Sequence, residues 1–337
     1  MVPGRCADLR RARGDLIDRR PFVVFNPASG RGRGAKRLSI YRQLLDEHLG
    51  DYAHAVTEAP GDEYVLADRA MDEGHDLIVA VGGDGTWSHV ADRIAARDED
   101  IAFGVLPAGT GNDFARNLEL SFADPAAAVA ALAAGRERKV DIGYIRTPSA
   151  PTAVGSERTS RVSAMSGDAR PRHFLNVIGI GFDVAVIDAA ASARFLRGEL
   201  LYKLTALQQL FRFPGAPLRA TDGEGFDRDG SHLMVTISNG RWFGGGFPIA
   251  PDGKIDDGLL HACLIADATP LQRLRLFGLA EKGRHVGDPQ VEMRSNRRFR
   301  FEFDAPVRFE ADGDVFRTEG AVLELEVKPG ALTLVGA

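Results

Sequence analysis

Two glycine-rich segments of this chain each carry an aspartate, in a pattern that suits phosphate chemistry. Residues 82–86 read G-G-D-G-T and include Asp84, and residues 106–116 read L-P-A-G-T-G-N-D-F-A-R and include Asp113. Glycines let backbone N–H groups approach an anionic oxygen closely. Phosphoryl transfer needs such donors, a cation that bridges the phosphates and a carboxylate near the attacking hydroxyl. The two segments therefore predict a phosphate-handling site.

Other candidate chemistries find less support. Asp256 and Asp257 precede a glycine, and Asp312 and Asp314 flank another. A solvated turn explains any single Asp-Gly pair, whereas two glycine loops that carry aspartates after neighbouring strands are harder to explain in this way. The histidines never fall into the spacing of a metal motif, and the G-x-S-x-G elbow of a serine hydrolase does not occur.

The elements that must position the two aspartates are short apolar runs. Residues 77–81 and 101–106 directly precede the two loops. Such runs predict buried parallel strands, and open α/β sheets bind ligands at the loops that leave the carboxyl ends of their strands. The alternation that predicts an α/β domain continues with strands at 21–25, 52–56 and 139–145 and with helices at 62–73, 87–96 and 126–134.

The turn after the first strand is rich in glycine and arginine, yet it matches neither common phosphate motif. The phosphate loop G-x-x-x-x-G-K-[ST] fails, because an alanine separates Gly34 from Lys36 and Arg37 stands where the hydroxyl belongs. The dinucleotide motif G-x-G-x-x-G fails because the glycines fall at 30, 32 and 34. A turn that holds phosphate near Arg31 or Arg33 and a merely flexible turn stay equally open on this segment alone.

Beyond residue 172 the pattern is mostly β. Segments 173–183, 233–238, 259–265, 291–303 and 322–327 predict strands with few helices between them, as in a sandwich-like second domain. Residues 147–172 are poor in large apolar residues and predict a disordered insert. Residues 194–213 repeat leucines at helical spacing. They predict a helix packed on the β domain, with a helix that meets a lipid surface as the alternative.

Composition limits the classes of protein. At 337 residues the chain is long for one core, so two domains are expected. A net charge of -5 argues against nucleic acid as a partner. Two cysteines are too few for a disulfide framework and suit a reducing cytoplasm. No run of about 18 apolar residues predicts a membrane span. Residues 1–20 predict a disordered leader, and an arginine-rich anchor for anionic lipid is the alternative.

Taken together, the motifs resemble the diacylglycerol kinase and sphingosine kinase type of lipid kinase, in its soluble bacterial branch. The resemblance covers roughly residues 21–145 and 173–337. G-G-D-G-T alone is shared with NAD kinases and phosphofructokinases, but the combination with the other motifs is specific. The motifs that carry it are N-P-A-S-G at 26–30, G-G-D-G-T at 82–86, G-T-G-N-D-F-A-R at 109–116, F-L-N at 174–176, G-I-G-F-D at 179–183, Asn239-Gly240 with Gly244-Gly245-Gly246, and Pro251 with D-D-G at 256–258.

This resemblance implies the fold. A nucleotide-binding α/β domain with a parallel sheet, like that of NAD kinase and phosphofructokinase, would comprise residues 21–140 and about 318–337. A mostly β, sandwich-like domain that binds the lipid would comprise residues 141–317. The end of the chain would therefore return to the first domain.

The resemblance also implies the residues of the site. Asp84 and Asp113 would position the catalytic Mg²⁺ through water, and Asp314 would be the general base. A structural Mg²⁺ would be held by the Asp257 carboxylate and the carbonyl oxygens of Lys254 and Leu259. ATP would lie among Asn26, Pro27, Ala28, Ser29, Gly30, Thr57, Gly82, Gly83, Asp84, Gly85, Thr86, Thr110 and Asn112.

Two positions depart from the family's pattern. Asp314 stands where the family has a glutamate in an Asp-Gly-Glu motif, so the carboxylate is kept on a side chain one methylene shorter. Ser88 and His89 stand where an Asn-Glu pair is usual. Serine can replace some of the hydrogen bonding, but histidine cannot replace a carboxylate near Mg²⁺. These changes bear on catalytic rate and substrate choice and do little to the fold.

The sequence therefore predicts an ATP- and Mg²⁺-dependent kinase that phosphorylates a lipid hydroxyl, diacylglycerol first and a sphingoid or related lipid second. NAD kinase is disfavoured because the lipid-kinase motifs would go unexplained. A nucleotide- or lipid-binding protein without turnover is the non-enzyme alternative, motivated by His89 and Asp314. The expected partner is a lipid at a membrane surface, reached by a cytoplasmic monomer or homodimer through peripheral contact with the inner membrane face.

Overall fold

The apolar runs of the first half form the centre of a parallel sheet. The computed structural model describes residues 19–118, 124–148, 172–192 and 208–336. In it, β1 (Pro21–Phe25), β3 (Leu77–Gly82) and β4 (Ala102–Pro107) are buried over almost their whole length, and β2 (Ala53–Val56) lies at the edge. The strands pair in the parallel order β2-β1-β3-β4. The loops that follow β1, β3 and β4 therefore leave the same edge of the sheet.

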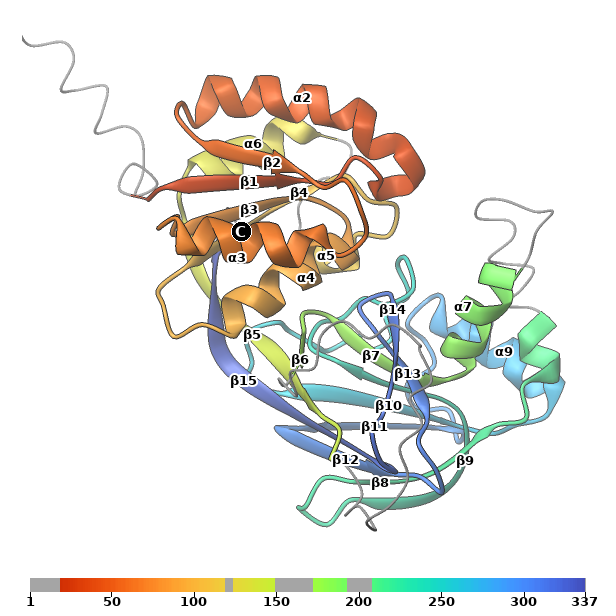
Figure 1. Cartoon of the computed structure of the whole chain (residues 1–337). Coiled ribbons are helices and arrows are strands. Elements are labelled where there is room, and N and C mark those ends of the chain that lie inside the picture. Colours follow the sequence, from red (N-terminus) through yellow and green to blue (C-terminus); the bar gives the residue numbers. More distant parts are fainter. Residues whose placement is uncertain (1–18, 119–123, 149–171, 193–207, 337) are drawn as a thin grey trace, which may run out of the picture.

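Helices cover both faces of this sheet (Figure 1). On one face α2 (Arg33–His48) packs against α6 (Pro125–Ala133), and on the other α3 (Asp62–Asp72) packs against α4 (Asp84–Ala95). The short elements η2 (Ser29–Gly32) and α5 (Asp113–Asn117) follow β1 and β4. Each face has its own apolar core, one built around Trp87 and Phe103 and the other around Phe25 and Tyr41. The predicted α/β architecture is confirmed.

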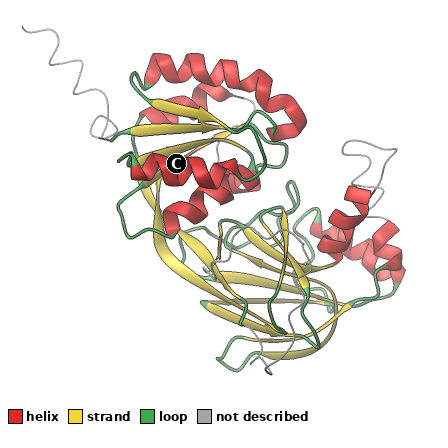
Figure 2. Ribbon diagram, in the orientation of Figure 1, coloured by secondary structure: helices red, strands yellow, loops and turns green. Residues whose placement is uncertain are grey.

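The rest of the chain forms a β-rich unit (Figure 2). Its strands pair antiparallel with one another around a core that includes Phe174, Phe299 and Phe301. The strands are β5 (Glu137–Arg146), β6 (Arg172–Phe174), β7 (Val177–Gly181), β8 (Ala216–Thr221), β9 (Asp227–Ser238), β10 (Leu260–Ala266), β11 (Val291–Asn296), β12 (Arg298–Glu302), β13 (Arg308–Ala311), β14 (Asp314–Arg317) and β15 (Val322–Val335).

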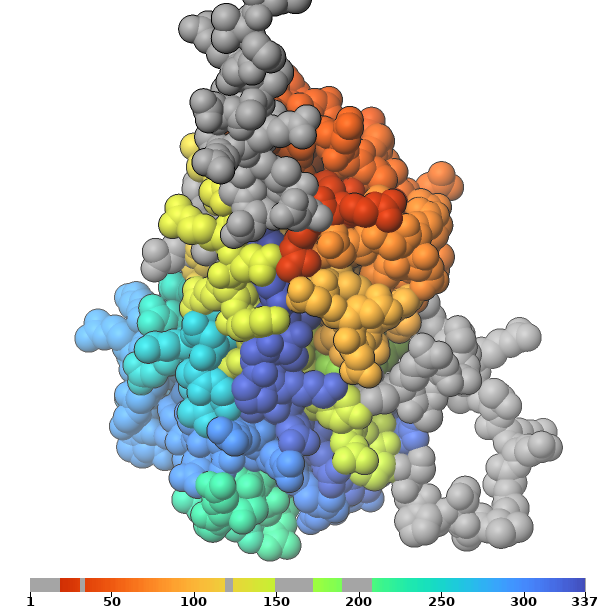
Figure 3. Space-filling view, turned by 90° about the vertical axis from the view of Figure 1, so that its left-hand side faces the viewer, coloured from red at the N-terminus to blue at the C-terminus, as the bar shows by residue number. Residues whose placement is uncertain are grey.

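The last strand joins the two units. The first residues of β15 pair with β12, whereas Thr333 to Val335 pair in parallel with β4. β5 runs beside β15 in both units, with a register shift between Lys328 and Leu332. Figure 3 shows the blue end of the chain lying between the yellow β5 region and the orange α/β unit. The prediction that the chain end returns to the first domain is confirmed.

Several local predictions were wrong or lie outside the described residues. α7 (Phe182–Ser192) begins where a strand and turn were predicted, and α9 (Pro270–Ala280) was not predicted. The predicted strand 291–303 is two strands, because β11 pairs with β10 and β12 pairs with β15. No described helix is long and apolar enough to cross a membrane. Of the predicted helix 194–213, residues 194–207 lie outside the described residues, and residues 208–212 are helical.

Two predicted disordered segments also fall mostly outside the described residues. Within the leader, Arg19 pairs with Glu137 at 2.7 Å and the N–H of Arg20 donates to Asp76 at 2.5 Å, so these two residues are held in place. Residues 149–171 of the insert are not described, and Arg172 belongs to β6.

Candidate active site

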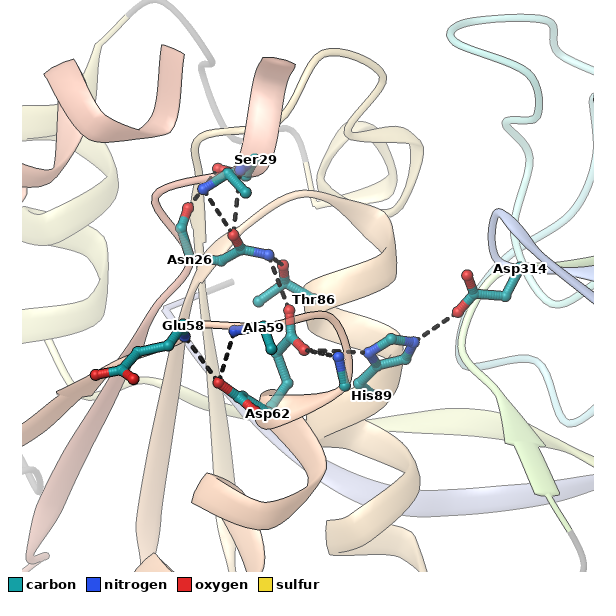
Figure 4. Close-up of polar contacts among 11 residues, drawn as sticks. Asn26, Ser29, Glu58, Ala59, Asp62, Thr86, His89 and Asp314 are labelled. Atoms are coloured by element: carbon teal, nitrogen blue, oxygen red, sulfur yellow. Dashed lines mark hydrogen bonds and ion pairs between the residues drawn. The ribbon is translucent and has the colours of Figure 1, made fainter. Parts of the chain in front are cut away.

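Asn26 shapes the first loop of the site. Its Oδ1 accepts the N–H groups of Ala28 at 2.9 Å and Ser29 at 3.2 Å. Its Nδ2 donates to Thr86 Oγ1 at 2.9 Å and to Glu63 Oε1 at 2.8 Å (Figure 4). The turn from Asn26 to Gly30 is thereby tied to the first turn of α4, so the residues predicted around ATP after β1 and β3 lie together.

The two glycine-rich loops touch through their backbones. A Cβ added to Gly83 would lie 3.0 Å from Gly109 Cα, and one added to Gly109 would lie 2.6 Å from Gly83 Cα. Only glycine permits this approach. The N–H groups of Ala108 and Gly109 both donate to the Gly82 carbonyl, at 2.6 and 3.0 Å. The loops meet at the N-terminus of α4, the end of a helix that binds phosphate.

Asp84 and Asp113 border the same glycine. A Cβ on Gly111 would lie 3.2 Å from Asp84 Oδ2 and 4.0 Å from Asp113 Oδ2. Asp84 Oδ1 accepts the N–H of Phe114 at 3.0 Å, and Asp113 Oδ2 accepts the N–H of Gly245 at 2.7 Å. The structure therefore brings together the two aspartates that the sequence singled out, with a loop of the β-rich unit beside them.

The electrostatics of this pair suit a divalent cation. Burial raises the pKa of Asp84, and burial together with the charge of Asp84 raises the pKa of Asp113 to about 6. Asp113 Oδ1 accepts no hydrogen bond from the described residues, although Arg116 Nε lies 3.5 Å away. Two buried carboxylates that oppose each other's ionisation are stabilised when a cation joins them. The donor set thus fits Mg²⁺, which prefers carboxylates and water.

Asparagines hold the β-rich unit against α5. Asn117 Nδ2 donates to Asn176 Oδ1 at 3.3 Å, and Asn117 Oδ1 accepts the N–H of Arg241 at 2.9 Å. Asn176 Nδ2 donates to the Trp242 carbonyl at 2.8 Å. These contacts fix the loop that carries Gly245, and so they place its N–H group on Asp113.

The turn between β13 and β14 carries two aspartates with different surroundings. Asp312 is buried, and it accepts the Ser88 hydroxyl at 2.6 Å. Asp314 has a side chain that is 50% exposed, and its Oδ2 lies 2.6 Å from His89 Nε2. Among the described residues, Asp314 makes no hydrogen bond or ion pair with Asp84 or Asp113. The structure therefore places the predicted base beside α4, next to His89.

The segment predicted to hold a structural cation is tied to the β5 and β15 ribbon. Asp141 accepts the N–H groups of Gly258 at 2.7 Å and Gly330 at 2.8 Å. Asp257 Oδ1 accepts the N–H of Leu259 at 3.0 Å, and Asp257 Oδ2 lies 3.0 Å from His261 Nε2. The described residues contain no cluster of three acidic, histidine or cysteine groups that could hold a metal. The cation role of Lys254, Asp257 and Leu259 stays a prediction, and it would depend on carbonyl oxygens.

The other residues predicted around the nucleotide lie near these loops. Thr57 follows β2 and is buried, and its N–H donates to the Phe25 carbonyl at 2.9 Å. Asn112 has a positive φ of 52° and donates to the Gly109 carbonyl at 3.1 Å. Thr110 lies at the wall of a cavity.

That cavity has a volume of about 780 Å³. Thr110, Gly111 and the glycines 244–246 line it on the side of the Asp84 and Asp113 pair. Its other walls are mainly apolar and come from α7, β9, β10 and α9, including Val186, Leu233, Ile265, Leu276 and Phe277. An apolar pocket of this size suits a lipid or another largely hydrophobic molecule.

Comparisons with known proteins cover both units of the chain. Residues 20–145 match the diacylglycerol kinase catalytic domain, and residues 176–336 match the YegS C-terminal NAD kinase beta sandwich-like domain. The chain belongs to the diacylglycerol kinase type of lipid kinase. The predicted family is confirmed, and the chain is an enzyme of this kind.

The relatives of this lipid kinase match along most of its length. A diacylglycerol kinase of Bacillus subtilis (strain 168) is 26% identical over 303 residues, which cover 88% of this chain and 90% of the relative. A diacylglycerol kinase of Mycobacterium tuberculosis (strain ATCC 25618 / H37Rv) is 29% identical over 292 residues and 87% of each chain. The crystal structure of a diacylglycerol kinase from Bacillus anthracis str. Sterne has a TM-score of 0.66 at 18% identity, covering 94% of this chain and 96% of that one. A second structure from that organism has a TM-score of 0.71 at 20% identity, covering 94% and 95%. Both structures show the same fold.

The sequence analysis of this lipid kinase did not identify one polar residue of the site. Glu63 lies in the first turn of α3, where an acidic residue commonly interacts with the helix dipole. It is instead 4% exposed and contacts both Asn26 and His89. Its neighbour Asp62, the first residue of α3, accepts the N–H groups of Glu58 and Ala59 and so holds the loop that precedes the helix.

Proposed function

We propose that this lipid kinase transfers the γ-phosphoryl group of ATP to the hydroxyl of diacylglycerol and so forms phosphatidic acid. The cavity of about 780 Å³ carries the proposal, because its apolar walls lead to Thr110 and Gly111 beside the Asp84 and Asp113 pair. The diacylglycerol kinase names of the relatives support the same acceptor. A phosphate donor on the glycine loops would then meet a lipid held in the cavity.

The residues of the α/β unit would hold the nucleotide. Asn26, Ser29 and Thr86 form one hydrogen-bonded group, and the contact of Gly83 with Gly109 leaves backbone N–H groups free of side chains. Asp84 and Asp113 would hold Mg²⁺, which when bound supplies positive charge that bridges the phosphates. Kinases of this family use ATP, and the identity of the cation is part of the proposal.

Asp314 would take the proton of the acceptor hydroxyl. Its Oδ2 is engaged by His89, and its Oδ1 makes no hydrogen bond within the described residues, so one carboxylate oxygen is available to the acceptor. Half of this side chain is exposed to solvent. The turn that carries it lies close to the first turn of α4, since a Cβ on Gly85 would be 4.0 Å from the Asp312 carbonyl.

The acceptor would be taken from a lipid surface by the outer face of α9. Leu271 is 79% exposed and Leu274 is 44% exposed on this helix, and Leu274 also lines the cavity. Arg273 donates to the carbonyls of Leu210 and Phe213, which holds the helical turn with the exposed Phe211 beside α9. Leu274 thus belongs both to the cavity wall and to the outer surface.

An assay with purified protein tests the proposed function. Labelled ATP and Mg²⁺ would be supplied with mixed micelles that contain diacylglycerol, monoacylglycerol, ceramide or a sphingoid base. The expected result is labelled phosphatidic acid at the highest kcat/KM of the panel. A clear preference for a sphingoid base would replace the acceptor and keep the lipid kinase, whereas phosphorylation of NAD without any lipid product would contradict the proposed function.

A further inference from the structure

His89 lies between two carboxylates that come from different parts of the fold. Its Nε2 is 2.6 Å from Asp314 Oδ2 in the β-rich unit, and its Nδ1 is 3.5 Å from Glu63 Oε2 on α3. The ring stacks on Tyr64 with 4.3 Å between centroids. The side chain is 16% exposed, so packing fixes the plane of the ring. Figure 4 shows one nitrogen of the imidazole pointing toward Asp314.

The contact continues from Glu63 into the nucleotide loops. Glu63 Oε1 accepts Asn26 Nδ2 at 2.8 Å, and the N–H of Gly61 donates to Oε2 at 3.2 Å. Asn26 in turn donates to Thr86 Oγ1. A chain of polar contacts therefore runs from the loop after β1 to the carboxylate of Asp314, and His89 is its link across the two units.

Only one protonation state of His89 satisfies both neighbours. A neutral imidazole carries one N–H group, whereas an imidazolium carries two. With Nε2–H donated to Asp314, a neutral ring would turn the lone pair of Nδ1 toward the Glu63 carboxylate, which repels it. The imidazolium presents N–H and positive charge on both sides, so the surroundings select the charged ring.

The charges around the ring favour the same state. Burial alone would lower the pKa of His89, but the hydrogen bond to Asp314 and the nearby Asp314 and Glu63 carboxylates raise it to about 9. Burial alone would raise the pKa of Glu63, but the nearby His89 ring and hydrogen bonds from backbone N–H groups lower it. The remaining polar and charged groups that line this small cleft are Tyr64 of α3, Ser88 and Asp92 of α4, and Arg172 and His173 of β6.

We propose that His89 is the positioning residue for Asp314, and that as an imidazolium it clamps this carboxylate to Glu63 and thus to the nucleotide loops. The inference rests on the proposed role of Asp314 as the base of the transfer. It adds that His89 holds Asp314 in a fixed position relative to the α/β unit without contacting either substrate. Asp314 Oδ2 is then the oxygen held by the protein, and Oδ1 is the oxygen that faces the acceptor.

The state of the ring can be measured without turnover. A titration of ¹⁵N-histidine-labelled protein followed by NMR, with the His89 signal assigned through His89→Gln, is expected to show a pKa far above the usual 6.5. In Asp314→Asn the pKa of His89 should fall by about one unit or more, because a charge partner is lost. A His89 that titrates near 6.5 in the wild-type protein, or that Asp314→Asn leaves unchanged, would overturn the clamp whatever the acceptor is.

Kinetics then separate positioning from a purely structural role. His89→Gln is expected to lower kcat about 100-fold with little change in KM for ATP. The variant loses the position of the base, whereas the nucleotide site is unchanged. Wild-type kcat should fall as the pH rises through about 9, the pKa at which the clamp loses its charge, and His89→Gln should lack this fall. His48→Gln, at an exposed position in the last turn of α2, is the matched control and should behave as wild type. Equal kcat values and equal alkaline profiles for His89→Gln and wild type would overturn the proposal.

Discussion

The hydroxyl of Ser88 on α4 donates to Asp312 Oδ2 across 2.6 Å, and this bond joins the α/β unit to a carboxylate buried in the β-rich unit. The same carboxylate accepts three successive backbone N–H groups at the start of β7, from Leu175 at 2.6 Å and from Asn176 and Val177 at 2.9 Å. One side chain thus fixes the β13–β14 turn, the start of β7 and α4 relative to one another. Asp314 directly follows that turn as the first residue of β14, so its position depends on Asp312.

Replacing Asp312 should therefore affect stability and activity together. In Asp312→Asn an amide nitrogen would take the place of one acceptor oxygen and face an N–H donor, and buried donors would be left without partners. We expect the free energy of unfolding to fall by about 2–4 kcal/mol, measured by urea denaturation. Asp304→Asn, at an exposed aspartate of the same unit, should stay within about 0.5 kcal/mol of wild type. Equal stability of both variants would show that Asp312 does not hold these elements.

The residues of the nucleotide side could be predicted because each lies in the segment that follows a strand. Asp84 follows β3, Asp113 follows β4 and Asn26 follows β1, and parallel strands bring such positions to one edge. The α/β alternation was read from continuous apolar runs, which are the strongest pattern in the chain. The pattern of strands therefore predicted where these groups meet, and the family resemblance supplied their roles.

The contacts between the two units could not be predicted in this way. Ser88 and Asp312 are 224 positions apart, and no local pattern relates them. In the sequence, His89 stands where the family usually has a glutamate, so a carboxylate was expected to be missing there. In the fold, His89 lies between two other carboxylates, Glu63 from α3 and Asp314 from β14. α9 was missed although Thr269 and Gln272 form a capping box at its start, because the strands around it dominated the pattern.

Replacing either of the two aspartates that are proposed to bind the cation should lower activity and leave the folded protein as stable as wild type or more stable. Burial raises the pKa of both Asp84 and Asp113, so each carboxylate is costly in the folded protein without a cation. Asp84→Asn and Asp113→Asn are expected to lower kcat on the order of 1000-fold, as loss of charge at a phosphoryl-transfer site does. Thermal unfolding in EDTA should show melting temperatures equal to or above that of wild type.

The addition of Mg²⁺ is the control for these two variants. The cation should raise the melting temperature of the wild-type protein, since it binds the folded state only, and should have less effect on either variant. A variant that keeps wild-type kcat would contradict the role of its aspartate in binding the cation.

Two further carboxyl groups make the stability of the protein depend on pH. Asp183 and Glu310 both lie beside Gly179, where an added Cβ would overlap the first and lie 3.0 Å from Oε2 of the second. Burial raises the pKa of both, and the charge of Asp183 raises that of Glu310 further. Both Asp183 oxygens accept no hydrogen bond from the described residues. The folded protein is therefore expected to favour a pair that holds a proton.

Because these pKa values are raised, the stability of the folded protein should fall as the pH rises. The folded protein keeps protons that the unfolded chain releases near pH 4, so their stabilisation is complete below that pH and is lost as the pH rises through the pKa of Asp183, about 7. The double variant Asp183→Asn with Glu310→Gln should be more stable than wild type at pH 8, by on the order of 2 kcal/mol. Urea denaturation at pH 4 provides the internal control, because there the two proteins should be equal. A stability difference that does not change with pH would exclude this linkage.

The exposed face of α9 should determine how tightly the protein binds lipid. Leu271→Ser and Phe211→Ser each remove an apolar side chain from the outer surface near the cavity, at positions that are 79% and 49% exposed. Burial of a leucine in a bilayer contributes about 1.5–3 kcal/mol, so each variant is expected to bind vesicles of phosphatidylcholine and phosphatidylglycerol about tenfold more weakly. Val65→Ser is the matched control, since Val65 is 64% exposed on α3 in the other unit.

Sedimentation with vesicles and activity on a lipid acceptor together test this surface. Leu274 is exposed on α9 and also lines the cavity, so a lipid could pass from the bilayer into the cavity without leaving apolar surroundings. Leu271→Ser should therefore lower activity on lipid in vesicles and leave activity on a short-chain, water-soluble acceptor unchanged, because the cavity itself is intact. Equal sedimentation of Leu271→Ser, Phe211→Ser and Val65→Ser would place the lipid contact elsewhere on the molecule, and an equal loss of activity on both acceptors would show that Leu271 acts on the cavity rather than on the membrane.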